Sequence, residues 1–307
     1  MEAGGRPLRN IIISSWRSGT TFLGEVLNAM PGNYYHFQPL LKYGHVQLKE
    51  SAQVKAALSS MKSLLKCDFR GMDDYFDYGS GHDFQFSHNT RLWDYCEHNK
   101  ELCSDPDFMT RYCRLFPFQS MKIVRLRLQF VQEILSDTEL NVKVVFLTRD
   151  PRGVMASRLQ RGFCRAAPDC SNPEILCEGM MRDYEAAGRF LKLYPDKLFV
   201  LRFEEFALNP NSTTQKLQKF LRLGRTQAMD EYIDSHTNTE VSGVTSTFRV
   251  SREVPYRWKN TLTFQYADQI QTACKEAMKL WGYRAAHNAT HMASEDFKPL
   301  EQYAIMQ

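Results

Sequence analysis

Residues 11–27 constrain the fold most, because three consecutive isoleucines stop abruptly at a polar turn and a helical pattern follows. The isoleucines predict a buried strand, and apolar residues at helical spacing predict a helix that begins near Thr20. A strand, a tight turn and a helix in this order aim backbone N–H groups at an anion. Arg17 adds a permanent positive charge, and the hydroxyl groups of Thr20 and Thr21 add donors. We therefore expect this turn to hold a phosphate-like group.

The same turn lacks the lysine of ATP and GTP hydrolases. The Walker pattern G-x-x-x-x-G-K-[ST] places a lysine directly after its second glycine. Here the turn has a single glycine, Gly19, and its cation, Arg17, comes before that glycine. Hydrolysis of ATP or GTP is therefore disfavoured. From this stretch alone, a plain strand-to-helix turn with a threonine cap remains the alternative.

A second strand–turn–helix unit follows residues 142–148, the strongest buried-strand pattern in the chain. Its turn begins with Arg149, and a proline in the first helical turn is favourable there. We expect Arg149, Arg152 and Ser157 to converge on an anion, because guanidinium groups bind phosphate in a bidentate manner. A surface salt bridge between Asp150 and Arg152 is the alternative for part of this set. Two such turns predict a ligand with two separated phosphate-like groups, such as a nucleotide with 5′ and 3′ phosphates.

Length and composition allow one large domain. With 307 residues, of which 43% are hydrophobic and 12% aromatic, the chain can bury a sizeable core. We predict an α/β fold, a P-loop-like parallel sheet flanked by helices, in a single domain over residues 10–285. Residues 1–9 are expected to be disordered or derived from an expression tag, and residues 286–307 to form a partly ordered tail.

The charge and the metal-ligand pattern narrow the range of partners. A net charge of +4 favours an anionic ligand over the dense basic surface of a nucleic-acid-binding protein, so no nucleic acid is expected as a partner. The sequence contains no C-x-x-C pair and no H-E-x-x-H motif. We therefore expect no metal site.

The cysteines and the glycosylation sequons favour the secretory pathway. The number of cysteines is even, and six of the eight cluster at residues 96–113 and 164–177, which is typical of disulfides in an oxidising compartment. The triplets at residues 211–213 and 288–290 match the N-glycosylation sequon. The chain has no apolar stretch of about 18 residues, and its first nine residues are too short and polar for a signal peptide. Either the full-length protein carries a membrane anchor that this chain lacks, which we prefer, or the protein is cytosolic with reduced cysteines.

Several further segments have readable patterns. The aromatic residues 34–40 predict a short strand that ends beside the first turn, and residues 46–66 and 264–281 predict helices. Residues 67–90 show no period and are expected to form a long surface loop. Five arginines are candidates for a basic acceptor surface, with scattered surface positions as the alternative: Arg125, Arg127, Arg158, Arg161 and Arg165.

The two anion turns resemble the motifs of one family. Residues 15–23 (S-W-R-S-G-T-T-F-L) resemble the 5′-phosphosulfate-binding motif of Golgi carbohydrate sulfotransferases, and residues 147–158 (L-T-R-D-P-R-G-V-M-A-S-R) resemble their 3′-phosphate-binding motif. The chain most resembles the group that sulfates the 6-hydroxyl of galactose, N-acetylgalactosamine and N-acetylglucosamine, including the chondroitin 6- and keratan sulfate enzymes. The resemblance continues at residues 121–126, 198–210 and 280–283.

The resemblance implies an activity and a cosubstrate. It implies transfer of a sulfuryl group from 3′-phosphoadenosine 5′-phosphosulfate (PAPS) to a glycan hydroxyl, usually at carbon 6, without a metal. It also implies a glycoprotein of type II topology, held in the Golgi membrane by a signal-anchor with its catalytic domain in the lumen. The residues implied to hold the 5′ side are Arg17, Ser18, Gly19, Thr20 and Thr21, and those implied to hold the 3′ phosphate are Arg149 and Ser157. The predicted cosubstrate-binding set also contains Trp16, Phe22, Asp150, Pro151, Arg152 and Arg249.

The catalytic prediction names Arg17 and the position of Gln38. Sulfuryl transfer is an in-line displacement, so Arg17 is expected to neutralise charge on the leaving phosphate. A base should take the proton of the attacking hydroxyl. In the family this base is typically a glutamate just before the proline of the aromatic strand, but this chain has Gln38 there. An amide cannot accept a proton near neutral pH.

Three interpretations of Gln38 remain open. The chain is a base-compromised variant with intact cosubstrate binding, which we favour; or it uses another base, such as His36 or His45; or it is a binding protein derived from an enzyme. The alternative function is therefore a catalytically silent homologue that binds a glycan or a nucleotide. A nucleotide kinase is opposed by the missing lysine.

Overall fold

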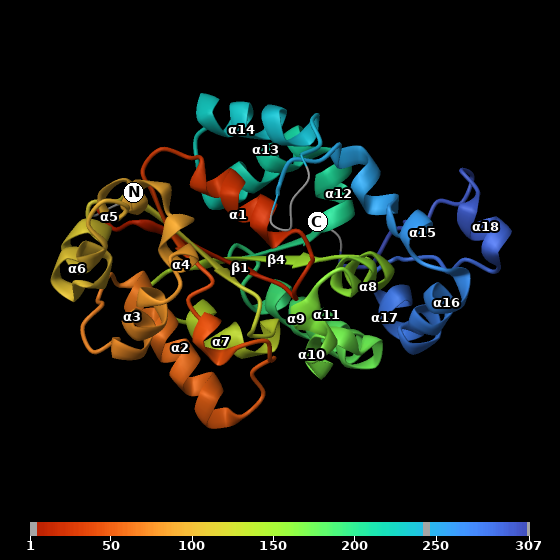
Figure 1. The fold of residues 1–307 in the computed structure, drawn as a ribbon, viewed down its shortest axis with the longest axis horizontal. Helices are drawn as coiled ribbons and strands as arrows, with labels where there is room; N and C mark the ends of the chain where they lie inside the picture. The colour runs from red at the N-terminus through yellow and green to blue at the C-terminus, as the bar shows by residue number, and fades with distance from the viewer. Residues whose placement is uncertain (1–4, 242–245, 306–307) are drawn as a thin grey trace.

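The computed structural model describes residues 5–241 and 246–305. Five strands form one sheet in the order β2-β3-β1-β4-β5, and every neighbouring pair is parallel. The strands are β1 (Leu8–Ile13), β2 (Asn33–Phe37), β3 (Phe118–Ile123), β4 (Lys143–Thr148) and β5 (Leu198–Arg202). The sheet runs through the middle of the molecule with helices on both sides (Figure 1). The predicted single-domain α/β fold is confirmed.

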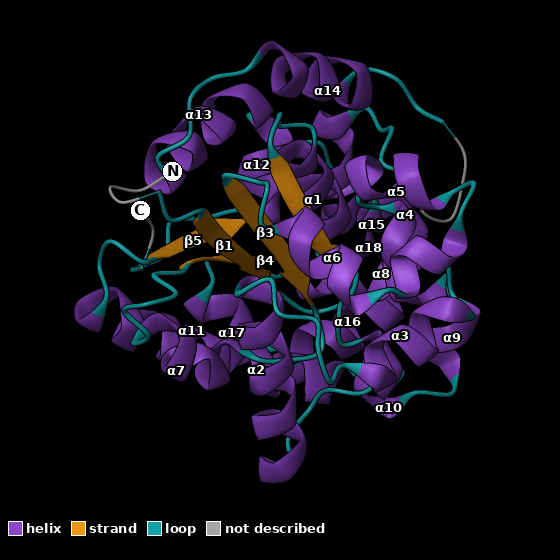
Figure 2. Ribbon diagram, turned by 90° about the vertical axis from the view of Figure 1, so that its left-hand side faces the viewer, coloured by secondary structure: helices purple, strands orange, loops and turns teal. Residues whose placement is uncertain are grey.

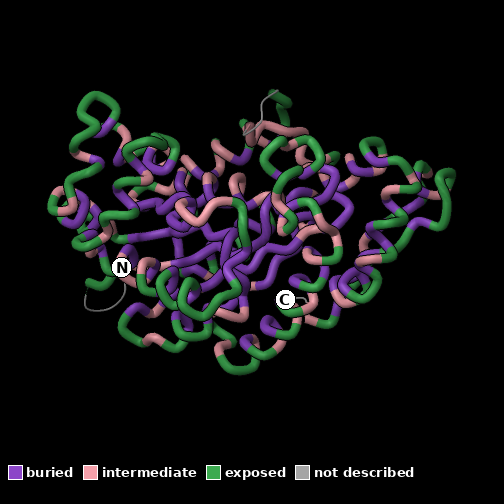
Figure 3. Tube along the Cα trace, turned by 60° about the horizontal axis from the view of Figure 1, so that its bottom comes forward, coloured by how far each residue is buried: buried purple, intermediate pink, exposed green. Residues whose placement is uncertain are grey.

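The residues of the central strand, β1, show why helices cover both faces of the sheet. Successive side chains of a strand point to opposite faces, so Ile12 enters one apolar core while Ile11 and Ile13 enter the other. Strands buried on both faces read as continuous apolar runs, which explains the isoleucine triplet. Figure 3 shows the strand traces as the buried centre of the molecule.

The face that receives Ile12 is covered by four helices, of which α13 (Pro210–Leu221) and α14 (Gln227–Thr237) lie above the strands in Figure 2. The other two are α1 (Thr20–Asn28) and α12 (Phe203–Leu208). Leu23, Val26 and Leu27 of α1 fill the space over the sheet. The helix predicted from the first sequence pattern therefore packs as expected.

The opposite face carries the larger core. Its elements include α2 (Ser51–Leu65), η3 (Leu128–Val131), α7 (Gln132–Leu135), α8 (Pro151–Leu159), α11 (Pro173–Leu193), α15 (Trp258–Thr261), α16 (Phe264–Ala273) and α17 (Lys275–Leu280). The predicted helix over 264–281 is thus two helices that meet at Cys274. The short element η1 (Leu41–Tyr43) also packs against this core, whereas α9 (Gly162–Arg165) and α10 (Pro168–Ser171) form a small separate core with Trp16 and Val124. The element η4 (Ser251–Tyr256) lies on the other face, against α12. In the described residues no helix is both long and apolar enough to cross a membrane.

The segment expected to be a long surface loop is helical instead. It contains α3 (Asp73–Ser80) and α4 (Phe84–Ser87), and it continues through α5 (Thr90–Cys96), η2 (Lys100–Ser104) and α6 (Pro106–Cys113). Phe69, Tyr75 and Phe86 are buried in the core. The prediction was wrong because helices of four to eight residues are too short to show a period.

All eight cysteines are paired, which confirms the predicted disulfides. Cys67–Cys113 and Cys96–Cys103 close the 67–113 segment, and Cys164–Cys170 joins α9 to α10. Cys177–Cys274 ties α11 to the junction of α16 and α17.

The two chain ends hold more structure than the sequence indicated. Strand β1 begins at Leu8, inside the range expected to be disordered. Residues 286–305, expected to be a partly ordered tail, include α18 (Ala289–Ala293), and Met292, Phe297 and Tyr303 are buried in the main core. A bridge between Tyr283 and Leu300 brings the segment back to the domain.

Candidate functional site

A cavity of about 510 Å³ lies at the carboxyl edge of the sheet. In a parallel sheet of this kind, ligands bind in the crevice outside the carboxyl ends of the strands. Every strand contributes to the lining here: Gln38 after β2, Lys122 in β3, Arg17 after β1, Arg149 after β4 and Phe203 after β5. The strand order therefore sets the order of these groups along the cavity.

The β1–α1 turn has the geometry of an anion cradle. Arg17 and Gly19 both adopt positive φ, and Gly19 is the N-cap of α1 without a side-chain cap. A Cβ on Gly19 would lie 2.3 Å from the ring of Phe203, so only glycine fits. The first N–H groups of α1 are thus left for a ligand. The hydroxyl of Thr21 accepts a hydrogen bond from Nζ of Lys122 at 3.0 Å.

The two predicted anion turns touch each other. Nε of Arg17 donates to Oγ of Ser157 at 3.0 Å, and Nη1 of Arg149 donates to the carbonyl oxygen of Arg17 at 2.9 Å. The guanidinium of Arg149 lies 4.4 Å from the centre of the Phe203 ring. The turns predicted from two distant sequence motifs therefore form one continuous surface.

The charged side chains that line the cavity in the described part of the chain are all cationic. Its charged residues are Arg17, Lys122, Arg125, Arg149 and Arg249, and none of the described residues that line it is an aspartate or a glutamate. Burial, aided by Arg161, Arg149 and Arg249, lowers the pKa of Arg17 to about 10. Burial lowers the pKa of Lys122 to about 7, with Arg125 and Arg17 acting in the same direction and Glu25 opposing them. Cations that repel one another are stabilised by an anionic ligand.

Most of the residues predicted to bind the cosubstrate line this cavity. They are Trp16, Arg17, Gly19, Thr20, Thr21, Phe22, Arg149 and Arg249. Ser157 reaches it only through its hydrogen bond with Arg17. Ser18 is buried beneath the turn, where its hydroxyl lies 3.0 Å from that of Ser15.

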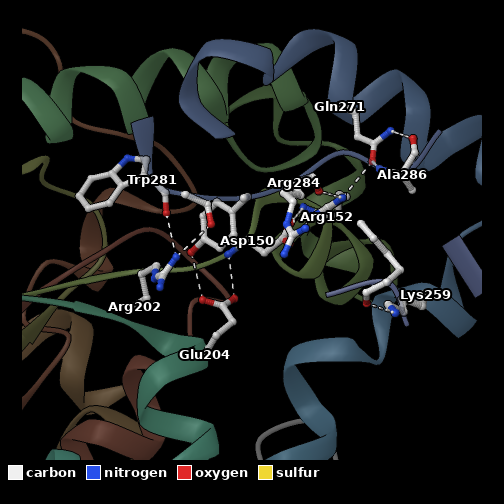
Figure 4. A network of polar contacts seen from close by, with 12 residues as sticks. Asp150, Arg152, Arg202, Glu204, Lys259, Gln271, Trp281, Arg284 and Ala286 are labelled. Carbon is white, nitrogen blue, oxygen red and sulfur yellow. Dashed lines mark hydrogen bonds and ion pairs between the residues drawn. The ribbon is translucent and has the colours of Figure 1, made fainter. Parts of the chain in front are cut away.

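Asp150 and Arg152 do not line the cavity, contrary to the prediction that Arg152 converges on an anion. Their side chains form an ion pair at 2.7 Å and are at most 1% exposed. Asp150 also caps α8 by accepting from the N–H of Arg152, while the Arg152 guanidinium donates to Gln271 and to the carbonyl of Arg284 (Figure 4). Pro151, the first residue of α8, is buried with them. The alternative of an ion pair was correct, although the pair lies in the interior.

Glu204 supports the second turn from below and was missed by the sequence analysis. Its carboxylate accepts from the N–H of Asp150 at 2.9 Å and from the hydroxyl of Tyr283 at 3.0 Å. Figure 4 shows this network beside Arg202, which donates to the carbonyls of Trp281 and Gly282. Burial, reinforced by the charge of Asp150, raises the pKa of Glu204 to about 7. No local sequence pattern indicates that a glutamate just after a strand is buried.

Gln38 faces the β2 end of the cavity. It has positive φ, and its side-chain oxygen accepts from Nη1 of Arg125 at 2.9 Å. Of the two histidines considered as alternative bases, His36 is 2% exposed and does not line the cavity, and burial lowers its pKa to about 3. His45 lines the mouth, where partial burial and Arg125 lower its pKa. His36 is therefore excluded as a contact of the acceptor.

The five arginines predicted as a basic acceptor surface do not form one, because Arg125, Arg127 and Arg158 are buried while Arg161 is partly buried and Arg165 is exposed. Arg127 is buried in an ion pair with Asp183 at 2.9 Å, and Arg158 is buried with its guanidinium on the carbonyls of Trp16 and Cys170. Among the five arginines of that set, Arg125 alone lines the cavity. Sequence gives the charge of a side chain but not its burial, which depends on contacts made after folding.

The fold and the site define a parallel α/β protein with a cationic cavity along the carboxyl edge of its sheet. The chain belongs to the sulfotransferase domain family, which matches residues 8–282.

Its relatives include enzymes named for sugar acceptors. The chain is 24% identical to carbohydrate sulfotransferase 3 of Mus musculus, over 98% of this chain and 73% of that protein. It is 27% identical to carbohydrate sulfotransferase 5 of Mus musculus, over 92% of this chain and 82% of that protein. Among solved structures it is similar to mouse sulfotransferase SULT7A1 complexed with PAP, at a TM-score of 0.45 and 11% identity, over 91% of this chain and 86% of the other. The predicted family resemblance is confirmed.

Proposed function

We propose that this protein is a carbohydrate sulfotransferase that moves a sulfuryl group from PAPS to a sugar hydroxyl. The observation that carries the proposal is the cavity lined by five cations and, among the described residues, no carboxylate. A donor with a 3′ phosphate and a 5′ phosphosulfate supplies the compensating negative charge, and it brings the sulfuryl group as an activated ester. Cavities of this size are typical of small-molecule sites.

The order of the strands supports an assignment of the two ends. We assign the 5′ side of the donor to the β1–α1 turn with Arg17 and Thr21, and the 3′ phosphate to Arg149, because these groups follow neighbouring strands of the sheet. The β2 end, with Gln38 and Arg125, is then left for the acceptor. The names of the relatives support a carbohydrate acceptor. From the sequence motifs we expect this acceptor to be the 6-hydroxyl of a galactose, N-acetylgalactosamine or N-acetylglucosamine residue in a glycan.

The chain's own residues supply the electrostatic part of catalysis. Charge that builds on the leaving phosphate oxygen is met by Lys122, by Arg17 and by the N–H groups at the start of α1. Arg125 holds the carbonyl end of the Gln38 amide, which turns the amide NH₂ towards the acceptor as a hydrogen-bond donor. Gln38 can thus orient a hydroxyl but cannot take its proton.

We also propose that the protein acts in the Golgi lumen, as a type II membrane protein in its full-length form. The four disulfides support an oxidising compartment. The asparagines of both sequons, Asn211 and Asn288, are exposed. Localisation of the tagged full-length protein by microscopy, with endoglycosidase digestion, tests this part.

Two measurements test the function. Calorimetry should show that 3′-phosphoadenosine 5′-phosphate binds in preference to ATP, and radiolabelled sulfate should pass from PAPS to at least one member of a glycan panel. Preference for ATP would overturn the proposal. Binding of the bisphosphate without transfer to any glycan would favour the second candidate, a silent binding homologue, which Gln38 specifically supports.

A further inference from the structure

A histidine–carboxylate pair lies in the cavity wall, formed by residues far apart in the sequence. Nδ1 of His88, just after α4, lies 2.6 Å from Oε1 of Glu25 on α1. The His88 side chain is 26% exposed and lines the cavity, while the Glu25 side chain is 14% exposed. The carboxylate of Glu25 also accepts from the Asn28 amide at 3.1 Å. Asn28 does not line the cavity, so the carboxylate is held by a residue outside the cavity lining.

The pair lies next to the part of the cavity where the proposed transfer takes place, between Gln38 and the anion cradle. The His88 ring stacks on Phe37 with ring centres 3.6 Å apart and 15° between planes, and Phe37 is the residue before Gln38. Nζ of Lys122 lies 4.3 Å from the centre of the same Phe37 ring and 3.0 Å from the Thr21 hydroxyl. Phe37 thus connects His88 to both the acceptor end and the anion cradle.

The chemistry of the pair suits proton abstraction. A carboxylate that accepts from Nδ1–H leaves the lone pair of Nε2 as an acceptor and stabilises the imidazolium that forms. Of the three histidines that line the cavity, His45, His88 and His236, only His88 is hydrogen-bonded to a carboxylate within the described structure. The charged groups near it are Glu25 from α1 and Lys122 from β3, with Arg17 and Arg125 in the same cavity.

We infer that His88 is the general base for the acceptor hydroxyl, in place of the carboxylate that Gln38 cannot provide, and that Glu25 is its positioning residue. The inference rests on the proposed function. In the step, the hydroxyl oxygen forms a bond to sulfur as the bond from sulfur to the 5′-phosphate oxygen breaks. The hydroxyl proton passes to Nε2 of His88, and the leaving phosphate keeps the electron pair of the broken bond. The imidazolium then releases its proton to solvent.

The test compares His88→Asn and Glu25→Gln with wild type, using the acceptor identified from the glycan panel. His88→Asn should lower kcat by ~10²–10⁴-fold, the usual contribution of a general base. Its affinity for 3′-phosphoadenosine 5′-phosphate and its melting temperature should stay unchanged. Glu25→Gln should lower kcat less and shift the acid limb of the pH–rate profile. His98→Asn, on an exposed turn outside the cavity, is the matched control and should match wild type.

A double variant separates loss of a base from loss of packing. Gln38→Glu added to His88→Asn should restore at least part of kcat and move the acid limb to lower pH, because a carboxylate is ionised well below the histidine range. Full activity of His88→Asn, or its loss in His45→Asn instead, would overturn the inference while leaving the proposed function intact. If wild type binds the bisphosphate but transfers no sulfate, and Gln38→Glu alone creates the activity, His88 is not a working base. If wild type does not bind the bisphosphate, the proposed function fails first.

Discussion

Gly19 shows how narrowly a single position is constrained in the anion cradle. Its φ of 91° belongs to the left-handed region, and the Phe203 ring occupies the space where a side chain would begin. Both conditions act at the N-cap of α1, where the free N–H groups are aimed at the ligand. A methyl group at this position is therefore expected to distort the anion-binding turn rather than the hydrophobic core.

Gly19→Ala should therefore weaken binding of the donor. The backbone strain and the clash with Phe203 displace the turn, so the affinity for 3′-phosphoadenosine 5′-phosphate should fall at least ~10-fold. Calorimetric titration measures the effect. Gly162→Ala, where a Cβ meets nothing within 4 Å, is the control. Wild-type affinity in Gly19→Ala would show that the turn does not bind the ligand.

Lys122 should produce a basic limb in the pH–rate profile. Its pKa is lowered to about 7, and its charged form is the one that stabilises the leaving phosphate. Hence kcat/KM for the donor should fall by about tenfold per pH unit above about pH 7, because Lys122 is then neutral in the free protein. The basic limb of the kcat profile should lie at higher pH, since the anionic donor, when bound, raises the pKa of Lys122 by favouring its ammonium form. A profile of kcat/KM that stays level to high pH would contradict this role.

At the scale of elements, Glu204 connects the β4–α8 turn to the C-terminal segment through Asp150 and Tyr283. Its pKa is raised from 4.5 to about 7, so the folded state binds the proton more tightly than the unfolded state. The stability from this group is complete below about pH 4.5 and is lost as the pH rises to about 7. Across that range the free energy of unfolding of wild type should fall by up to about 3 kcal/mol relative to Glu204→Gln. Urea denaturation at several pH values measures this difference, and a constant difference would refute it.

The disulfide Cys177–Cys274 should contribute more to stability than Cys96–Cys103. The first joins residues 97 apart, from α11 to the α16–α17 junction, whereas the second joins residues 7 apart. A longer closed loop removes more entropy from the unfolded chain, so replacing both cysteines of the first pair with alanine should cost about 2–5 kcal/mol. The same change in the second pair should cost less. Equilibrium urea denaturation of both variants gives the comparison.

For the whole molecule, the features that could be predicted from the sequence are those that depend on residues close together along the chain. The strand–turn–helix units at β1 and β4 were predicted because apolar runs, turns and helical periods are local. The burial of Arg152 and the helices over residues 73–87 were missed because they depend on contacts made after folding. Glu25 and His88 are 63 residues apart, and no sequence pattern indicates that they meet.

The 67–113 segment has a consequence for how such a molecule can diversify. The bond between Cys67 and Cys113 closes this segment at its base, and Tyr78, Phe84 and His88 from within it line the β2 end of the cavity. The donor-facing groups come instead from the strand ends of the sheet. Under the proposed function this covalently closed segment carries part of the acceptor wall, and the contacts of His88 and Arg91 with α1 connect it to the helix that begins at the anion cradle. Sequence changes within the segment are therefore expected to alter acceptor choice directly and donor binding only through α1.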